Sequence, residues 1–523
     1  MSARVVVVGG GLAGITAALG CADAGHRVHL VESRPWLGGL TYSFDRGGLR
    51  VDNGQHVFLR CCTRYRALLA RLGVERDVNL QSRLDIPVRG LLLEDGTPRR
   101  RTDLDGRTGL AAAADRIAGD KGPLAQTPTV AGRLQRLPLP APLHLSWALL
   151  RYPWLSTAAR IRFVRAALAL RAVDVDDPRT DATSFGDWLR AHGQDRAAIE
   201  SLWELVGIAT LNARADDVSL ALAATVFQIG LLTHADAADI GWSRVPLGQL
   251  HGAAARAALT AAGATVTTRA KVTAIRRASG GWTVSAEGDT IAADAVVLAV
   301  PPAVAEALLP PRSVDLPPNF AAALGSSPII NVHVVYDRRV MTEPFRAGIG
   351  TVAQWVFDRT AASGLGPGGP DGPRSTGGPS STGAPDPWGT PGRETHSCPR
   401  GLDRGAEQYL AVSVSAADEF VDMPTAELRR LFLPALHRVL PATYSAEVRD
   451  FFVTRERHAT FRPTPGSARL RPAAHTALPG LYLAGAWTAT GWPATMEGAV
   501  RSGEAAVALM NSDLSAPVPQ AVR

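Results

Sequence analysis

Three glycines near the start of the chain have the type and spacing of a phosphate-binding turn. Gly9, Gly11 and Gly14 follow the apolar run 4–8 and precede helix-forming residues from Ile15 onward. The first glycine permits a tight turn, the second lets the backbone approach a pyrophosphate, and the third lets helix and strand pack closely. Because the amino end of such a helix attracts anions, this spacing predicts a dinucleotide-binding turn.

An acidic residue stands where a nucleotide site needs one. Glu32 ends a second apolar run, residues 27–31, at the spacing expected for a carboxylate that accepts hydrogen bonds from ribose hydroxyls. A carboxylate here disfavours a 2′-phosphate on that ribose. Strand, glycine turn, helix, strand and acid together predict a Rossmann-type unit rather than a glycine-rich structural turn.

The residues after Glu32 distinguish between the dinucleotides. Residues 33–39 read Ser-Arg-Pro-Trp-Leu-Gly-Gly, which resembles the extended fingerprint of the glutathione-reductase-like and amine-oxidase-like flavoproteins. The resemblance implies an FAD cofactor, with Arg34 near the phosphates and the backbone of Gly38 and Gly39 close to the ribityl chain. NAD-dependent dehydrogenases usually lack this glycine pair.

The resemblance continues near the end of the chain, where residues 481–487 read as a buried strand followed by a helix. In these flavoproteins the amino end of that helix points at the flavin. The N–H groups of Met496 and Glu497 would then stabilise negative charge on the reduced flavin. The family usually has Asp after Gly485, but this chain has Ala486. One lost hydrogen bond costs about 1–3 kcal/mol, so we expect weaker flavin retention.

The cofactor domain is expected to be discontinuous. Short strand-like runs occur within residues 264–300, and the resemblance implies that Val272 offers its backbone to the adenine. We therefore expect an α/β fold with mixed α+β parts, in which a Rossmann-type FAD-binding domain of the glutathione-reductase and amine-oxidase type is interleaved with a substrate domain. The expected boundaries are 1–85, 245–305 and 476–512 for the FAD-binding domain, 86–244 and 306–475 for the substrate domain, 361–407 for a disordered Gly-, Pro- and Ser-rich insertion and 513–523 for a loose tail.

A motif after the first unit narrows the resemblance. Residues 52–56 read Asp-Asn-Gly-Gln-His. This motif is similar to one in the hydroxysqualene dehydroxylases, which are also described as squalene-associated FAD-dependent desaturases. Further matching segments are Leu202–Leu205, Leu211–Asn212, Arg244–Leu247, Arg455–Phe461 and Thr490–Thr495.

The narrower resemblance implies a reaction. Reduced FAD would deliver hydride to hydroxysqualene, an apolar C30 allylic alcohol, and give squalene in a bacterial route toward hopanoids. NAD(P)H or a separate electron donor would reduce the flavin again. His56 is the first candidate for the acid that assists departure of the hydroxyl, and Glu204 is the second. Gln55 is a candidate flavin contact.

Other readings of the same motifs stay open. A carotenoid or phytoene desaturase or isomerase shares the fold, FAD and an apolar substrate, but it oxidises or isomerises. An amine oxidase would need an aromatic cage beside the flavin, and an aromatic content of 6% offers few candidates. A flavin-binding scaffold without activity is the remaining alternative, because Ala486 removes a usual cofactor contact.

Composition narrows the partners. With 46% hydrophobic and 20% charged residues the chain is an ordinary globular one. The net charge of +7 comes from scattered arginines, so nucleic acid is not an expected partner. The four cysteines have no metal-ligand spacing, which predicts no metal site and a reducing, cytoplasmic compartment. Residues 145–170 mix Trp and Arg with apolar residues, as expected of peripheral contact with the inner face of a membrane or of an amphipathic helix pair.

Overall fold

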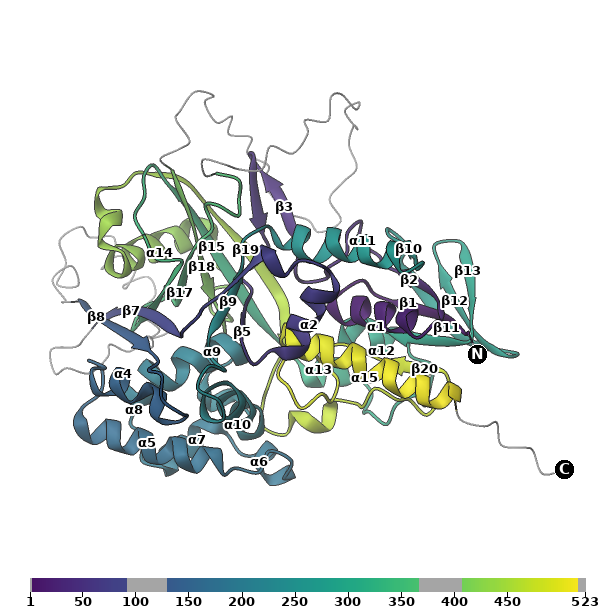
Figure 1. The fold of residues 1–523 in the computed structure, drawn as a ribbon, viewed down its shortest axis with the longest axis horizontal. Coiled ribbons are helices and arrows are strands. Elements are labelled where there is room, and N and C mark those ends of the chain that lie inside the picture. Colours follow the sequence, from purple (N-terminus) through teal and green to yellow (C-terminus); the bar gives the residue numbers. More distant parts are fainter. Residues whose placement is uncertain (1, 92–128, 366–406, 516–523) are drawn as a thin grey trace.

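The computed structural model describes residues 2–91, 129–365 and 407–515. Figure 1 shows a parallel sheet with the N-terminus at one end of the molecule, and a larger sheet with a group of helices at the other. Within the described residues, none of the helices combines the length and the apolar character that crossing a bilayer requires.

A five-stranded parallel sheet forms the first region. Its strand order is β10 (Thr265–Thr267), β2 (Arg27–Val31), β1 (Arg4–Val8), β14 (Ala295–Leu298) and β20 (Leu481–Leu483). Every neighbouring pair is parallel. Strands from the beginning, the middle and the end of the chain therefore build one sheet, buried on both faces as parallel sheets usually are.

Helices pack on one face of this sheet, and an antiparallel meander packs on the other. Val5 and Val7 pack with the helices, whereas Val6 and Val8 pack in the cluster that contains Trp282. The helices are α1 (Leu12–Asp23), α2 (Thr63–Arg71), α11 (Ala254–Ala261) and α15 (Met496–Ser515). The other cover includes an antiparallel meander of β11 (Val272–Ala278), β12 (Gly281–Ala286) and β13 (Asp289–Ala293).

The second region is a seven-stranded sheet with helices around it. Its strand order is β19 (Val448–Phe461), β15 (Ser326–Tyr336), β18 (Gln408–Val414), β17 (Trp355–Asp358), β16 (Phe345–Ile349), β7 (Asp85–Leu91) and β8 (Thr129–Gln135). The main helices are α4 (Ser146–Leu150), α5 (Thr157–Arg171), α6 (Pro178–Ala182), α7 (Phe185–Ala191), α9 (Glu204–Leu211), α10 (Leu220–Phe227) and α14 (Thr425–Val439). Side chains of α14 pack in one cluster with those of β15 and β18.

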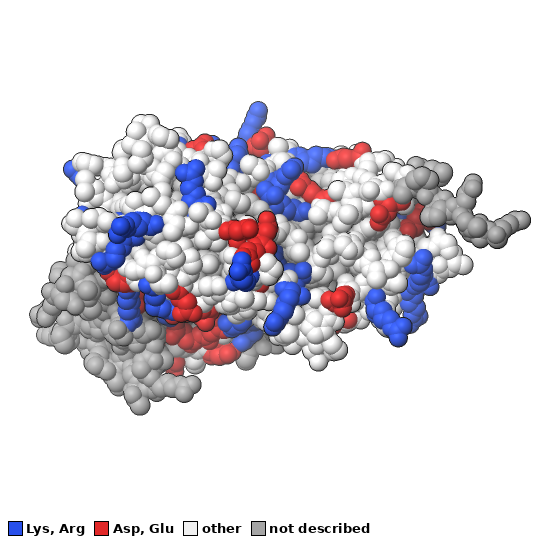
Figure 2. All heavy atoms as spheres, turned by 90° about the horizontal axis from the view of Figure 1, so that it is seen from below, with Lys and Arg blue, Asp and Glu red and all other residues white. Residues whose placement is uncertain are grey.

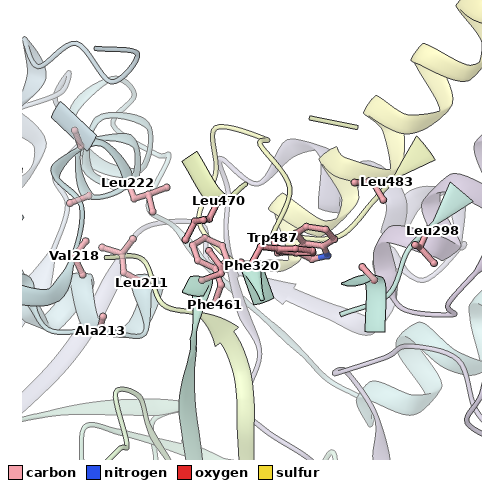
Figure 3. Close-up of a cluster of buried hydrophobic side chains, with 14 of the residues drawn as sticks. Leu211, Ala213, Val218, Leu222, Leu298, Phe320, Phe461, Leu470, Leu483 and Trp487 are labelled. Carbon is pink, nitrogen blue, oxygen red and sulfur yellow. The ribbon is translucent and has the colours of Figure 1, made fainter. Parts of the chain in front are cut away.

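Two features join the regions. Strand β9 (Ile240–Ser243) pairs with β5 (Val57–Leu59) and β6 (Val78–Leu80). The expected boundaries assign β9 to the substrate domain and its two partners to the FAD-binding domain. An apolar cluster runs from Leu211 and Leu222 through Phe461 to Leu483 and Trp487 (Figure 3). The division into a cofactor domain and a substrate domain stays a prediction.

Two expected boundaries need correction. Residues 361–365 were assigned to the loose insertion, but they form a turn in which Leu365 is buried in a cluster with Val51 and Tyr409. Residues 366–406, the bulk of that insertion, lie outside the described residues. The tail was expected from residue 513, but α15 continues to Ser515, because Asp513 accepts a 2.6 Å hydrogen bond from the Tyr482 hydroxyl.

Candidate active site

The glycine turn after β1 has no room for a side chain at Gly14 but has open space at Gly11. A Cβ atom at Gly14 would lie 1.9 Å from the carbonyl oxygen of Gly9, whose φ is +106°. A Cβ atom at Gly11 would meet only the Cα of Gly39, at 3.8 Å. Gly11 caps α1 without a side-chain hydrogen bond. The first N–H groups of α1 have no partner within the helix, so this turn has the form of an anion cradle.

Glu32 ties the turn to the segment after β2. Its Oε2 accepts the N–H of Gly10 at 2.6 Å, and its Oε1 accepts the N–H of Arg34 at 2.7 Å and the hydroxyl of Ser33 at 3.0 Å. A carboxylate can accept about four hydrogen bonds. Glu32 therefore keeps acceptor capacity for a ribose hydroxyl while it holds the turn.

The Gly38–Gly39 pair lies directly against the turn. The N–H of Gly38 donates to the carbonyl of Gly10 at 2.8 Å. Both glycines have positive φ, and a Cβ at Gly39 would lie 2.8 Å from the Cα of Gly11. The Arg34 guanidinium lies 3.4 Å from the Gly39 carbonyl oxygen. Arg34, Gly38 and Gly39 thus lie beside the cradle, and their contacts with FAD stay a prediction.

The start of α15 offers backbone N–H donors, and the side chain of Glu497 in its first turn binds helix α2. Met496 and Glu497 are its first two residues, so their N–H groups lack intrahelical partners. The buried Glu497 carboxylate accepts the N–H groups of Tyr65 at 2.7 Å and Arg64 at 3.3 Å, and it pairs with Arg501 at 2.8 Å. A carboxylate at the amino end of α2 is favoured by the helix dipole. Glu497 therefore clamps α2 to α15.

A buried arginine that the sequence did not reveal holds the loop between β20 and α15. Arg471 donates to the carbonyls of Thr488 at 2.7 Å and Trp492 at 2.6 Å, and its Nη2 lies 3.5 Å from the carbonyl oxygen of Ala486. Burial lowers its pKa to about 10. Its partners are backbone carbonyls, which carry no sequence signal. Arg471 thus fixes the segment in which the expected aspartate is missing.

Two further predicted cofactor residues lie at the edges of this region. Val272 is the buried first residue of β11. Gly485 follows β20, and its N–H donates to the Ser502 hydroxyl of α15 at 2.8 Å. That bond joins the end of β20 to the helix whose amino end is expected at the flavin.

A small hollow lies beside the motif 52–56 and strand β17 of the seven-stranded sheet. One part of its lining is polar and the other is apolar. The lining residues are Asp52, Gln55, His56, Val57, Trp242, Ser243, Leu247, Pro344, Phe357, Asp358 and Arg359. The lining therefore places hydrogen-bonding groups next to apolar side chains.

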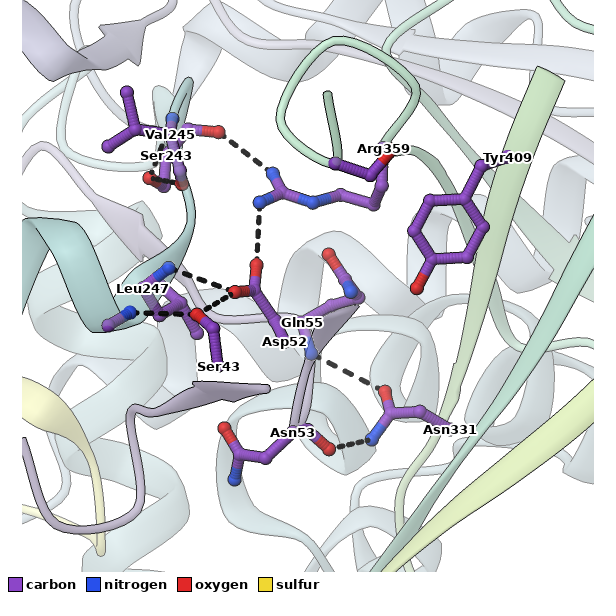
Figure 4. Close-up of polar contacts among 12 residues, drawn as sticks. Ser43, Asp52, Asn53, Gln55, Ser243, Val245, Leu247, Asn331, Arg359 and Tyr409 are labelled. Carbon is purple, nitrogen blue, oxygen red and sulfur yellow. Dashed lines mark hydrogen bonds and ion pairs between the residues drawn. The ribbon is translucent and has the colours of Figure 1, made fainter. Parts of the chain in front are cut away.

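A buried ion pair organises this hollow. Asp52 pairs with Arg359 at 2.7 Å, and both side chains are less than 10% exposed. The second Asp52 oxygen accepts the N–H of Leu247 at 2.9 Å and the hydroxyl of Ser43 at 2.6 Å, and Arg359 also donates to the carbonyl of Ser243 at 2.8 Å (Figure 4). The two partners are 307 residues apart in the chain, so no local motif points to Arg359.

Gln55 presents a buried donor that lacks a partner among the described residues. Its backbone N–H donates to the Asn331 side chain at 3.4 Å, and Asn331 in turn donates to the carbonyl of Asn53 at 3.3 Å. The Gln55 Nε2 atom is buried without a hydrogen bond. Buried polar groups nearly always have a partner. An atom of a cofactor or substrate in the hollow would supply it.

Half-buried His56 lines the hollow, and buried His251 is close enough for their charges to interact. Loss of water lowers the pKa of His56 to about 4, although the nearby Asp52 charge opposes this shift. His251 shares a 2.8 Å hydrogen bond with the Tyr65 hydroxyl, and burial, followed by the charge of His56, lowers its pKa to about 3. Both imidazoles are therefore neutral at pH 7. His56 can donate a hydrogen bond there, but it does not carry an extra proton.

The second candidate acid lies elsewhere. Glu204 lines a separate hollow with Trp203 and Leu211, which shares no residue with that of His56. Its carboxylate accepts the N–H of Ala215 at 3.1 Å. The structure thus brings Asp52, Gln55 and His56 together but leaves Glu204 apart, in a position suited to holding a turn.

The chain is similar to a known protein family over most of its length. Residues 12–511 match the family model described as flavin containing amine oxidoreductase. The chain belongs to this family. The predicted α/β fold class and the predicted FAD cofactor are thereby confirmed. As a member of the flavin-containing amine oxidoreductases, the protein is an FAD-dependent oxidoreductase.

Individual relatives differ in how much of the chain they match. A hydroxysqualene dehydroxylase of Rhodopseudomonas palustris is 28% identical, over 98% of this chain and 99% of its own length. A zeta-carotene desaturase of Capsicum annuum is 29% identical, over 43% of this chain and 34% of its own length. The crystal structure of an oxidoreductase from Methanosarcina mazei has a TM-score of 0.62 at 15% identity and covers 97% of this chain, which shows a shared fold.

The described residues fit FAD. The cradle around Gly11 is open where a pyrophosphate would approach, and the Glu32 carboxylate keeps acceptor capacity for a ribose. The amino end of α15 and the unpartnered Nε2 of Gln55 offer donors. Bound FAD supplies two-electron redox chemistry.

Two alanine substitutions in the turn should have different effects. In Gly11→Ala the new methyl meets no protein atom closer than 3.8 Å, so we expect unchanged stability without cofactor and at least tenfold weaker FAD binding. In Gly14→Ala the methyl overlaps the Gly9 carbonyl, so the apoprotein itself should lose about 1–3 kcal/mol. Urea unfolding of apoprotein and FAD titration measure the two effects. Unchanged FAD affinity in Gly11→Ala would contradict the placement of the cradle.

Buried histidines should make the fold sensitive to acid. The pKa of His333, which bonds Tyr409 and Thr454, is lowered to about 3 by burial, as those of His56 and His251 are to about 4 and 3. In the unfolded chain these groups titrate near pH 6.5. Between about pH 6.5 and 4 the unfolded state therefore binds protons that the folded state refuses, and stability falls.

As the pH is lowered, the free energy of unfolding is expected to fall by up to about 1.4 kcal/mol per pH unit for each histidine. Urea unfolding at pH 7, 6 and 5 measures this slope, and His333→Gln should make it shallower. Equal slopes in the two proteins would show that His333 does not contribute.

Proposed function

We propose that this flavin-dependent oxidoreductase reduces hydroxysqualene to squalene. The observation that carries the proposal is the similarity to the R. palustris hydroxysqualene dehydroxylase, which extends over 98% of this chain. The similarity to the carotene desaturase extends over 43%. The longer match includes both the cofactor cradle and the region around the hollow.

The lining of the hollow supports the same substrate class. Val57, Trp242 and Phe357 offer apolar surface to a hydrocarbon chain, and Gln55 and His56 offer hydrogen bonds to a hydroxyl group. A C30 allylic alcohol has both parts. The apolar lining also excludes water, which would otherwise compete for an allylic cation.

In this proposal the chain's own residues assist departure of the hydroxyl. The neutral imidazole of His56 and the free Nε2 of Gln55 each donate a hydrogen bond to the leaving oxygen. The hydroxyl would leave as water after taking up one proton, and a hydride supplied by the reduced cofactor would replace it on the allylic carbon. The Asp52–Arg359 pair holds the segment that carries both donors. The reducing equivalents come from NAD(P)H bound transiently or from a separate electron donor.

Anaerobic incubation of the purified protein with FAD, dithionite and hydroxysqualene tests the proposal. We expect squalene, detected by mass spectrometry, only when protein, reduced flavin and substrate are all present. A visible spectrum of the same sample reports bound flavin. Bound flavin without squalene would overturn the proposed substrate while leaving the family intact, and absence of bound flavin would favour a scaffold without activity.

The second candidate is desaturation of a carotenoid, supported by the partial match to the carotene desaturase. That reaction removes hydrogen from its substrate and needs oxidised rather than reduced flavin. Incubation with zeta-carotene in air, followed by absorption spectroscopy, separates the two: a longer-wavelength product in place of squalene would favour the desaturase.

A further inference from the structure

Exposed apolar side chains are concentrated in one short part of the described chain. Seven of the thirteen large hydrophobic side chains that are exposed fall within residues 139–168. They are Leu139, Leu143, Trp147, Leu150, Ile161, Val164 and Leu168, and we call them the α4–α5 patch. Exposed apolar side chains gathered in this way indicate an interaction site rather than ordinary surface variation.

Helix α5 shows that this exposure is systematic. Its buried residues include Ala159, Ala166 and Leu170, which face the protein core. Ile161, Val164 and Leu168 are spaced three and four residues apart and therefore lie together on the opposite face. A helix that is apolar on both faces needs a second apolar environment.

Charge identifies that environment. Residues 136–173 contain six arginines and no Lys, Asp or Glu, and the chain continues with Asp174, Asp176 and Asp177. Two of the arginines are paired with carboxylates, Arg136 with Asp239 and Arg162 with Asp195. Arg151, Arg165 and Arg171 are exposed and offer their charge to a partner. Figure 2 views the molecule from the side where α5, α6 and α7 lie in Figure 1, and its left half shows blue and red side chains beside one another among wide white areas.

The individual arginines are placed at the edges of the apolar residues. Arg165 and Arg171 of α5 are exposed, and helical geometry puts them on the two flanks of the stripe formed by Ile161, Val164 and Leu168. The Arg151 guanidinium lies 4.1 Å from the ring centre of the exposed Trp147. Tryptophan and arginine around an apolar stripe are typical of helices that lie in the interface of a bilayer.

The patch is also connected to the hollow. The inner sides of α4 and α5 contribute Ala148 and Ala159 to an apolar cluster that reaches Phe357, with Trp242 packed against it. Phe357 and Trp242 line the hollow beside His56. The helices that carry the patch therefore share one apolar cluster with two residues of the hollow.

We propose that the α4–α5 patch docks on a bilayer surface that contains anionic lipids. The apolar side chains insert between the head groups, and the arginines bind lipid phosphates. Insofar as this contact delivers an apolar substrate to the hollow, it rests on the proposed function. The docking itself stands on exposure and charge alone.

Co-sedimentation of the full chain with vesicles tests the docking without any substrate. We expect binding to phosphatidylcholine vesicles with 30% phosphatidylglycerol, weakened by salt, and about tenfold less binding to phosphatidylcholine alone. The triple variant Ile161→Ser/Val164→Ser/Leu168→Ser should bind the anionic vesicles at least tenfold more weakly. The double variant Arg165→Gln/Arg171→Gln should lose most of the preference for anionic lipid.

Matched variants on other surfaces control for general changes in charge and polarity. Val304→Ser/Tyr444→Ser removes exposed apolar side chains elsewhere, and Arg276→Gln/Arg430→Gln removes exposed charges elsewhere. Both should bind like the parent.

Absence of vesicle binding at low salt, or equal losses in patch and control variants, would overturn the proposal. If the triple serine variant instead turned a dimer into a monomer in light scattering, the patch would be an interface between two copies. Because squalene formation is measured separately, failure of one proposal leaves the other testable.

Discussion

Replacement of His56 by leucine is expected to lower squalene formation by about 100- to 1,000-fold, the usual effect of removing one hydrogen-bond donor beside a developing negative charge. The imidazole lines the hollow beside the unpartnered Gln55 amide. Its depressed pKa keeps it neutral at pH 7, so the rate should not fall between pH 6 and 8 through titration of this group. Single-turnover squalene formation with pre-reduced flavin measures the effect on the chemical step.

Glu204→Gln is the matched control for this substitution. The narrower family resemblance points to both residues, but the structure gives Glu204 a backbone partner, Ala215, and a different hollow. We expect a rate within about threefold of the parent, with unchanged flavin content. A loss in Glu204→Gln as large as that in His56→Leu, at equal stability, would return Glu204 to the list of candidate acids and contradict the roles assigned here.

Replacement of Arg359 by methionine is expected to destabilise the protein by about 3–5 kcal/mol, because it leaves the Asp52 charge buried without its partner. Asp52 also holds the backbone of Leu247 and the hydroxyl of Ser43, so the motif that carries Gln55 and His56 should loosen. Urea unfolding monitored by tryptophan fluorescence measures the loss. Squalene formation should fall as well, even at temperatures where the variant is folded.

Two further variants test the cause of that loss. Arg338→Met removes an exposed arginine paired with Asp337, and solvent-exposed pairs of this kind contribute little to stability. Asp52→Asn/Arg359→Met removes both charges of the buried pair and should be less unstable than Arg359→Met alone. If the double variant were the less stable of the two, hydrogen bonds rather than the unpaired charge would account for the effect.

The nucleotide-binding part was predictable because its signals are local. Gly9, Gly14 and Glu32 act through backbone contacts within a single strand–helix–strand unit, so their spacing alone carries the information. The FAD assignment followed from two adjacent glycines, and membership in the flavin-containing amine oxidoreductases agrees with it.

The candidate active site was less predictable because its contacts are distant in sequence. Asp52 and Arg359 are 307 residues apart, and Arg471 binds carbonyl groups that any residue could supply. The family resemblance offers His56 and Glu204 as alternative acids, and the structure places them in the linings of different hollows. Sequence similarity identifies residues a family shares, but it does not say which of them touch.

The five-stranded parallel sheet can be completed only late in synthesis. Its edge strand β20 lies near the end of the chain and pairs with β14, which the ribosome makes much earlier. Until Leu481–Leu483 emerge, the nascent protein presents an unpaired apolar strand edge and lacks the helix that closes the cofactor site. Such late, long-range pairing slows folding and exposes intermediates to aggregation. Chaperone supply and slow translation should therefore raise the yield of active enzyme more than added FAD does.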